Sequence, residues 1–164
     1  MPELPEVETV IRGLATVLQG QTILRAETRR AGMRWPFPAG LAETLSGARV
    51  EGFRRRGKYM LMRLSNAQSV LIHLGMSGRM VARPRGDNQP PPAHEHLILE
   101  TTTGTHVGFV DPRRFGSVDL VPTAAEDSHK LLAGMGPEPL EDAFTPPVLA
   151  AGLAGKQTPI KAAL

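Results

Sequence analysis

The chain of 164 residues has no cysteine, one tryptophan and one tyrosine. Without cysteine it has no disulfide framework, no thiol nucleophile and no cysteine-ligated zinc site within these residues. No apolar run approaches the roughly 18–20 residues that span a bilayer, and the acidic N-terminus lacks the basic and apolar regions of a signal peptide. We therefore expect a cytoplasmic protein that does not bind membranes.

The composition is that of a globular protein rich in turns, with 41% hydrophobic residues, 21% charged residues, 17 glycines and 15 prolines. The net charge of +3 is modest, but basic residues gather in three places. They are Arg29, Arg30 and Arg34, then Arg54, Arg55, Arg56 and Lys58, then Arg113 and Arg114. Such clusters are typical of polyanion-binding proteins, although solvated faces carry them as well.

Apolar residues recur at helical spacing near the start of the chain and predict an amphipathic helix over residues 3–19, which Gly20 is placed to end. From Thr22 onward the pattern changes to short β-prone runs between Gly, Pro and Asn clusters. The runs predict eight strands, at residues 23–28, 50–53, 59–64, 69–74, 78–82, 97–101, 107–110 and 117–121. A short helix is predicted over residues 41–45, and an exposed Pro-rich loop over residues 83–93.

This order of elements predicts a mostly β protein with flanking helices (α+β), folded as a two-layer antiparallel sandwich or flattened barrel. We expect residues 1–122 to form this N-terminal domain and residues 123–164 to form a linker and the start of a helical module. A helix is predicted over residues 124–133, with further helix starts at Thr145-Pro146 and Thr158-Pro159. Because one isolated turn is not stable, we expect the module to be incomplete at Leu164.

Pro2 and Glu3 are the first candidates for chemistry. Removal of Met1 would leave Pro2 with a free secondary amine, which can attack an electrophilic sugar carbon and form a charged iminium that acidifies the neighbouring C–H bond. Glu3 is suitably near to move protons, and the positive end of the following helix favours its charged form. Both residues also suit an ordinary first helical turn, so these two positions alone decide nothing.

Lys58 and the HEH sequence at residues 94–96 allow two interpretations each. Lys58 opens an apolar strand, from which its ammonium can reach a site and bind phosphate or protonate a leaving group. Alternatively, Lys58 is a strand-edge lysine that prevents aggregation. The histidines His94 and His96 have strand spacing around Glu95, but without further ligands they make a poor metal site. We predict no metal in this chain.

Several motifs together resemble the formamidopyrimidine-DNA glycosylase family. The opening MPELPEVETV is similar to the family's N-terminal signature. Further motifs follow in the family's order: RRGKYMLM at 55–62, HLGMSG at 73–78, HEH at 94–96, DPRRFG at 111–116, GPEPL at 136–140 and TPIKAAL at 158–164. The resemblance covers the whole chain and implies a DNA glycosylase with abasic-site lyase activity, whose helical module is a helix–two-turn–helix.

The resemblance also implies a role for individual residues. Pro2 would be the nucleophile, Glu3 the acid and base, and Lys58 an essential lysine. The side chains implied to enter the duplex where the lesion has left are Met76, Arg113 and Phe115, since apolar or planar groups can restore stacking there. The implied phosphate contacts are His94, Arg113 and, at a position where the family usually has a basic residue, Gln157 with Lys156 before it.

For the complete protein, the resemblance implies excision of oxidised purines such as 8-oxoguanine and formamidopyrimidines from double-stranded DNA, followed by β- and δ-elimination at the abasic site. It implies one zinc ion in a four-cysteine finger beyond Leu164, and we expect a bacterial monomer that acts at the nucleoid. We expect these 164 residues alone to be inactive or much weakened as a glycosylase.

Other interpretations stay open at this stage. Met76, Arg113, Phe115 and Leu4 argue against the sister endonuclease VIII branch, which uses different inserted residues. A non-catalytic module that binds damaged DNA would need the same basic and inserted residues, with Pro2 only starting a helix. A tautomerase with an N-terminal proline would share only Pro2, and it generally starts a strand there instead of a helix. Met76 and Phe115 are also residue types that more often lie in a core.

Overall fold

The computed structural model describes residues 3–84, 86 and 92–135. Helix α1 (Leu4–Leu18) begins after Glu3, and a capping box joins Glu3 and Glu6 through side-chain bonds to each other's backbone N–H groups. The predicted periodicity is present, because one face of the helix is buried. Its buried residues are Val7, Ile11, Leu14 and Leu18. No helix in the described part of the chain is long and apolar enough to cross a membrane.

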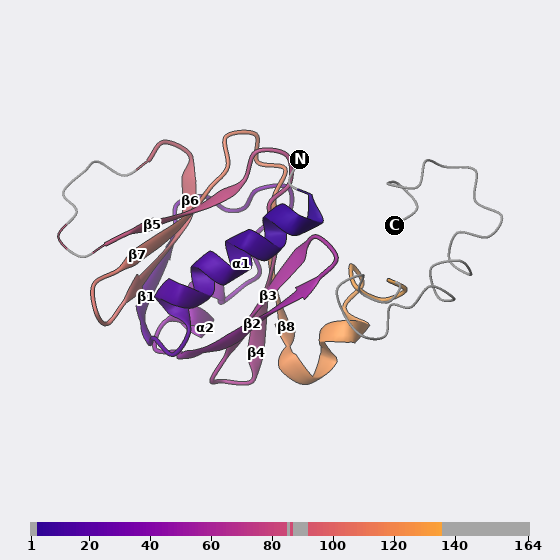
Figure 1. The fold of residues 1–164 in the computed structure, drawn as a ribbon, viewed down its shortest axis with the longest axis horizontal. Helices are drawn as coiled ribbons and strands as arrows, with labels where there is room; N and C mark the ends of the chain where they lie inside the picture. The colour runs from indigo at the N-terminus through magenta and orange to yellow at the C-terminus, as the bar shows by residue number, and fades with distance from the viewer. Residues whose placement is uncertain (1–2, 85, 87–91, 136–164) are drawn as a thin grey trace.

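In the described part of the chain, eight strands form two four-stranded antiparallel sheets, as the β-prone runs predict (Figure 1). The first sheet has the order β1 (Ile23–Thr28), β6 (Glu95–Thr101), β7 (His106–Val110) and β5 (Arg79–Arg83). The second has the order β2 (Val50–Arg56), β3 (Tyr59–Leu64), β4 (Gln68–His73) and β8 (Ser117–Pro122). The short helix α2 (Leu41–Leu45) joins β1 to β2, and the α+β sandwich expected from the sequence is confirmed.

The main core lies between the sheets and is closed on one side by α1, which contacts β2, β3 and β5 (Figure 1). Phe109 of β7 is fully buried there together with Leu18 and Met60. A second, smaller core lies on the other face of the second sheet, where Leu61 and Leu71 pack against Leu132. Since both faces of β3 and β4 are covered, these strands carry consecutive buried residues instead of an alternating pattern.

The segment that covers this second face differs from the sequence prediction. In place of an α-helix over residues 124–133, the chain forms the 3₁₀ helix η1 (Thr123–Ser128) followed by turns. His129 leaves the helix in an extended conformation and its Nε2 lies 2.7 Å from Asp119 Oδ2. Tertiary contacts thus override the helix propensity of this segment. The predicted helix starts at Thr145 and Thr158 lie outside the described residues.

Candidate functional site

Glu3 and Lys58 meet at one end of the sandwich although they are far apart in the sequence. Lys58 Nζ lies 3.5 Å from Glu3 Oε2, and each side chain is more than a third exposed. Glu3 caps α1, and Lys58 follows Gly57 in the turn between β2 and β3. Pro2 immediately precedes Glu3 in the sequence but lies outside the described residues. The pair offers a carboxylate and an ammonium side by side at an accessible surface.

Arg55 attaches this turn to α1. Its Nε donates a hydrogen bond to Glu8 Oε2 at 3.1 Å, and its Nη1 donates to the carbonyl oxygen of Gly57 at 3.0 Å. Arg55 is largely buried, so this ion pair is screened less than a surface pair would be. The arrangement holds the turn that bears Lys58 against the helix that Glu3 caps.

The loop of residues 74–78 passes very close to the loop of residues 111–116. Gly75 has φ of 64°, and a Cβ there would stand 2.5 Å from backbone atoms of Phe115 and Gly116. The N–H of Gly75 donates to His73 Nδ1 at 3.0 Å. Only glycine fits this close approach of the two loops. The side chain of the neighbouring Met76 is 46% exposed.

Asp111 holds the second loop in shape. Its fully buried carboxylate accepts hydrogen bonds from Ser77 Oγ at 2.7 Å and from the N–H groups of Arg114 and Gly116 at 3.1 and 2.8 Å. Ser77 Oγ in turn accepts from the N–H of Arg113 at 3.1 Å. These charge-assisted bonds fix both loops to each other.

The two loops present their side chains outward. Phe115 is 46% exposed, and the guanidinium carbon of Arg113 lies 5.4 Å from the centroid of its ring. A core position for Met76 and Phe115, the alternative that the sequence left open, is therefore excluded. Two exposed apolar side chains beside an arginine suit contact with a stacked, negatively charged polymer.

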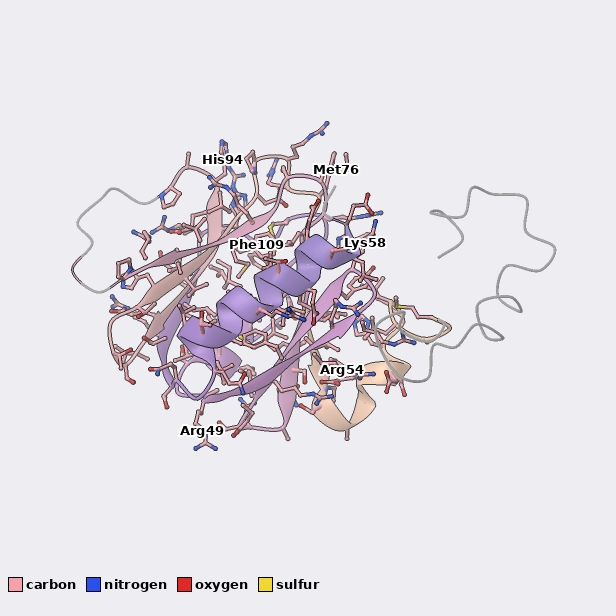
Figure 2. All side chains as sticks on the ribbon, in the orientation of Figure 1. Arg49, Arg54, Lys58, Met76, His94 and Phe109 are labelled. Carbon is pink, nitrogen blue, oxygen red and sulfur yellow. The ribbon has the colours of Figure 1, made fainter. Side chains whose placement is uncertain are left out.

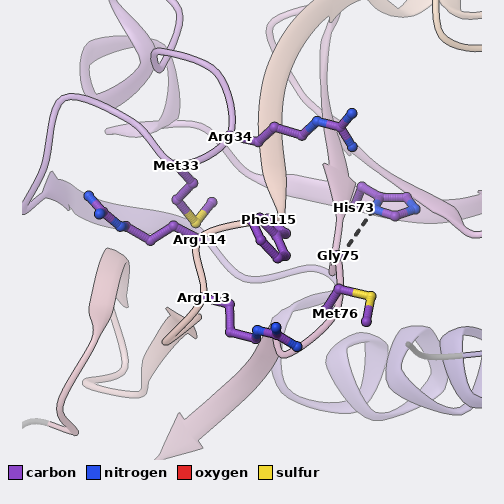
Figure 3. A pocket seen from close by; sticks show the side chains of 8 residues that line it. All are labelled: Met33, Arg34, His73, Gly75, Met76, Arg113, Arg114 and Phe115. Carbon is purple, nitrogen blue, oxygen red and sulfur yellow. Dashed lines mark hydrogen bonds between the residues drawn. The ribbon is translucent and has the colours of Figure 1, made fainter.

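A cavity of about 780 Å³ opens between these loops and the loop after β1 (Figure 3). Its lining residues are Met33, Arg34, His73, Gly75, Met76, Arg113, Arg114 and Phe115. Three arginines and no acidic side chain belong to this described lining. Burial lowers the pKa of His73, and the charges of Lys58 and Arg34 lower it further, so its ring is neutral at neutral pH. The described lining of the cavity is therefore electropositive.

The HEH sequence separates into three different environments. His94 is exposed with φ of 63°, and its carbonyl oxygen accepts from the N–H of Asp111 at 3.0 Å. His96 is buried, with its Nε2 2.8 Å from the carbonyl oxygen of Asp111. Glu95 is buried and forms ion pairs with Arg29 and Arg83 at 3.4 and 3.3 Å. The motif therefore leaves the side chain of His94 exposed and buries that of His96, and both residues contact the backbone of Asp111.

The described residues do not form a zinc site. The sequence has no cysteine, and no group of three or more His, Asp and Glu among residues 3–84, 86 and 92–135 could hold a metal ion.

The sequence prediction placed Met76, Arg113 and Phe115 together, and the structure brings them to one cavity. Lys156 and Gln157 lie outside the described residues. The prediction named Arg34 and Arg114, which line the same cavity, only as members of basic clusters. It assigned no role to His73, which also lines the cavity, or to the buried Asp111. All but Arg34 stand inside the quoted motifs HLGMSG and DPRRFG, so the motifs themselves held the signal.

A family model for the formamidopyrimidine-DNA glycosylase N-terminal domain matches residues 1–118. The chain belongs to this family. It is 66% identical over 164 residues to a formamidopyrimidine-DNA glycosylase of Acidiphilium cryptum and 57% identical to one of Gluconobacter oxydans. These matches cover all of this chain but 58% and 59% of the two relatives, so the chain spans less than two thirds of their length.

The fold also matches solved members of the glycosylase family. A crystal structure of Lactococcus lactis formamidopyrimidine-DNA glycosylase, bound non-covalently to DNA with an AP site, superposes with a TM-score of 0.81 and 29% identity. The match covers 93% of this chain and 57% of that one. Another structure, of MutM with DNA that contains carbocyclic 8-oxo-G, has a TM-score of 0.75 and 31% identity. The family predicted from the motifs is therefore confirmed.

Proposed function

We propose that this chain carries the nucleophile and the duplex-probing side chains of a base-excision DNA glycosylase with abasic-site lyase activity. The observation that carries the proposal is the Glu3–Lys58 pair, in which Lys58 Nζ lies 3.5 Å from Glu3 Oε2. Glu3 directly follows Pro2 in the sequence. The exposed Met76 and Phe115, beside Arg113, support it because they suit insertion into a duplex. Relatives crystallised with damaged DNA support the same partner.

The proposed chemistry begins at Pro2. Its neutral secondary amine attacks C1′ of the damaged nucleotide, so that a C1′–N bond forms and the bond from C1′ to the base breaks. The leaving base takes up a proton, and the new ammonium gives up the proton of the former amine, so the two transfers balance. Glu3 donates a proton to the sugar ring oxygen as the ring opens, which yields a cationic iminium between C1′ and Pro2. The iminium acidifies C2′–H, so loss of that proton expels the 3′-phosphate in β-elimination. Loss of a further proton expels the 5′-phosphate in δ-elimination.

Lys58 and the electropositive cavity would bind the DNA around this reaction. The Lys58 ammonium is placed to contact a phosphate or to protonate a leaving group next to Glu3. Arg113 can donate hydrogen bonds to the base left unpaired, while Met76 and Phe115 restore the stacking that the extruded nucleotide gave up. His94 is an exposed candidate for a flanking phosphate.

We further propose that the complete protein removes 8-oxoguanine and formamidopyrimidines, as the family resemblance implies. In this proposal residues 1–122 form the catalytic domain, and residues 123–164 form the linker and the start of a helix–two-turn–helix module. Lys156 and Gln157 of that module are proposed phosphate contacts, and the single zinc ion of the complete protein lies outside this chain. The contacts of residues 123–135 with the sandwich are consistent with a linker that starts on its surface.

Borohydride trapping on a duplex with a single abasic site tests the chemistry of this chain. Reduction of the iminium fixes the protein to the DNA, and mass analysis of the digested adduct locates the bond. We expect the adduct on Pro2, no adduct after acetylation of the N-terminal amine, and a slower reaction of Lys58→Met. Lys130→Met is the matched control, since Lys130 is exposed and far along the chain from the site, and it should trap like the unaltered chain.

Two results would overturn the proposal. An adduct that persists after acetylation would place the nucleophile on a lysine. Binding of the duplex without any adduct, both by this chain and by a protein completed beyond Leu164, would instead establish the non-catalytic module for damaged DNA that the sequence left open.

A further inference from the structure

We propose that Glu126 is a positioning residue, which fixes the β2–β3 hairpin and thereby the Lys58 ammonium relative to Glu3. The coupling between Glu126 and the hairpin stands on contacts in the structure, whereas its effect on catalysis rests on the proposed function.

Glu126 lies 2% exposed under the second sheet and binds three neighbouring strands. Arg63 of β3 donates from Nη2 to Oε1 at 2.7 Å and from Nε to Oε2 at 3.0 Å. Arg54 of β2 donates to Oε1 at 3.0 Å, and Ser69 Oγ of β4 donates to Oε2 at 2.6 Å. One carboxylate from η1 therefore accepts hydrogen bonds from side chains on β2, β3 and β4. Hydrogen bonds to a charged group are stronger than those between neutral groups.

A second set of contacts joins the same segment to the turn of the hairpin. Arg56 Nη2 donates to the carbonyl oxygen of Met135 at 2.8 Å. The terminal methyl of Met135 lies over Gly57, at the place where a side chain on that residue would stand. Gly57 has φ of 60°, and Lys58 is the next residue. Residues 123–135 thus hold the hairpin at its strands through Glu126 and at its turn through Met135.

The opposite side of the hairpin is held by the Arg55–Glu8 ion pair to α1, so the turn lies between two attachments. Figure 2 labels Arg54 beside η1 and Lys58 near the start of α1, along one hairpin. If Glu126 loses its charge, the apolar contact of Leu132 with Leu61 and Leu71 still holds the segment to the sheet. Arg54 keeps its hydrogen bond to Asp127 of η1 at 2.9 Å, but Arg63 of β3 and Ser69 of β4 lose their charged acceptor. The hairpin is then held less firmly, and the Lys58 turn can move away from Glu3.

Hydrogen exchange of the intact 164-residue chain tests the coupling without any activity. Glu126→Gln should raise the exchange rates of the amides of residues 56–59 by about tenfold. Glu51→Gln is the matched control, since it removes one carboxylate from the end of β2 that lies away from the turn. There Glu51 Oε1 pairs with Arg49 Nη2 at 2.8 Å. Leu45→Ala, at a fully buried residue of α2, controls for lower stability in general. Neither control should raise exchange selectively at the turn.

The trapping reaction tests the catalytic consequence. At saturating abasic-site DNA, Glu126→Gln should lower the single-turnover trapping rate by about tenfold to a hundredfold, as small misplacements in active sites do. Its Kd for the duplex should change by less than about twofold, because the variant leaves the cavity side chains in place. The trapping rates of Glu51→Gln and Leu45→Ala, corrected for the folded fraction, should match the unaltered chain.

Each negative result has one meaning. Unchanged exchange at residues 56–59 in Glu126→Gln overturns the positioning role. Raised exchange with an unchanged trapping rate shows that the hairpin position does not limit the reaction, and it overturns the catalytic consequence. If the unaltered chain is not trapped at all, the proposed function fails, while the exchange experiment still decides whether Glu126 positions the hairpin.

Discussion

Replacement of Glu126 by glutamine should remove a pH-dependent part of the stability of this protein. Burial by itself would raise the pKa of Glu126, but hydrogen bonds from Arg63, Ser69 and Arg54 outweigh it and lower the pKa from its ordinary value of 4.5 to about 2. The charged carboxylate is therefore favoured by the folded protein. The unfolded chain binds the proton more readily, so folding and deprotonation support each other.

The direction and size of the effect follow from this lowered pKa. A carboxylate with a depressed pKa stabilises the fold above its unfolded pKa, and the stabilisation is lost as the pH falls from 4.5 toward 2. Each pKa unit corresponds to about 1.4 kcal/mol, so the contribution amounts to about 3 kcal/mol. Glutamine retains the shape of the side chain but leaves Arg63 without its carboxylate, while Arg54 keeps Asp127 at 2.9 Å. We expect Glu126→Gln to lower the free energy of unfolding at neutral pH by about 2–3 kcal/mol.

Urea unfolding at a series of pH values measures this directly. The difference in unfolding free energy between the unaltered chain and Glu126→Gln should be largest near neutral pH and should shrink steadily below pH 4.5. Glu51→Gln, which alters the exposed Arg49–Glu51 pair at the start of β2, should lower the free energy of unfolding by less than about 1 kcal/mol at any pH. A difference for Glu126→Gln that stays constant down to pH 2 would refute the linkage argued from the hydrogen bonds that Arg63, Ser69 and Arg54 donate.

Three further outcomes are expected. Asp111→Asn should lower the free energy of unfolding by about 2–3 kcal/mol, measured by thermal denaturation, because three donors lose a buried charged acceptor. Gly75→Ala should cost well over about 2 kcal/mol, whereas Gly40→Ala, with φ of 75° but open space around it, should cost only about 1 kcal/mol; equal losses would contradict the close approach of the two loops. Arg113→Ala should weaken duplex binding and reduce the slope of log K against log salt by about one, whereas Phe115→Ala should weaken binding at an unchanged slope in the same titration.

The sequence alone determined the elements whose signals are local. The apolar spacing from Val7 to Leu18 defines α1, because a helix repeats its buried face every three to four residues. The β-prone runs and the turn residues between them predicted all eight strands and the antiparallel sandwich. The ordered motifs predicted the family, which residues 1–118 confirm. The roles of all the predicted site residues stay predictions, and Pro2, Lys156 and Gln157 also lie outside the described residues.

Only the tertiary structure decided which residues meet. The sequence could not show that Glu126 is buried, because its partners Arg54, Arg63 and Ser69 lie on three strands more than 50 positions away. The same contacts turn a segment of good helix formers into η1 and cover a second face of β3 and β4. The 3.5 Å between Lys58 and Glu3 likewise depends on a hairpin attached to α1 and to residues 123–135. Local patterns fix local conformation, whereas burial and charge pairing depend on distances that only the folded chain sets.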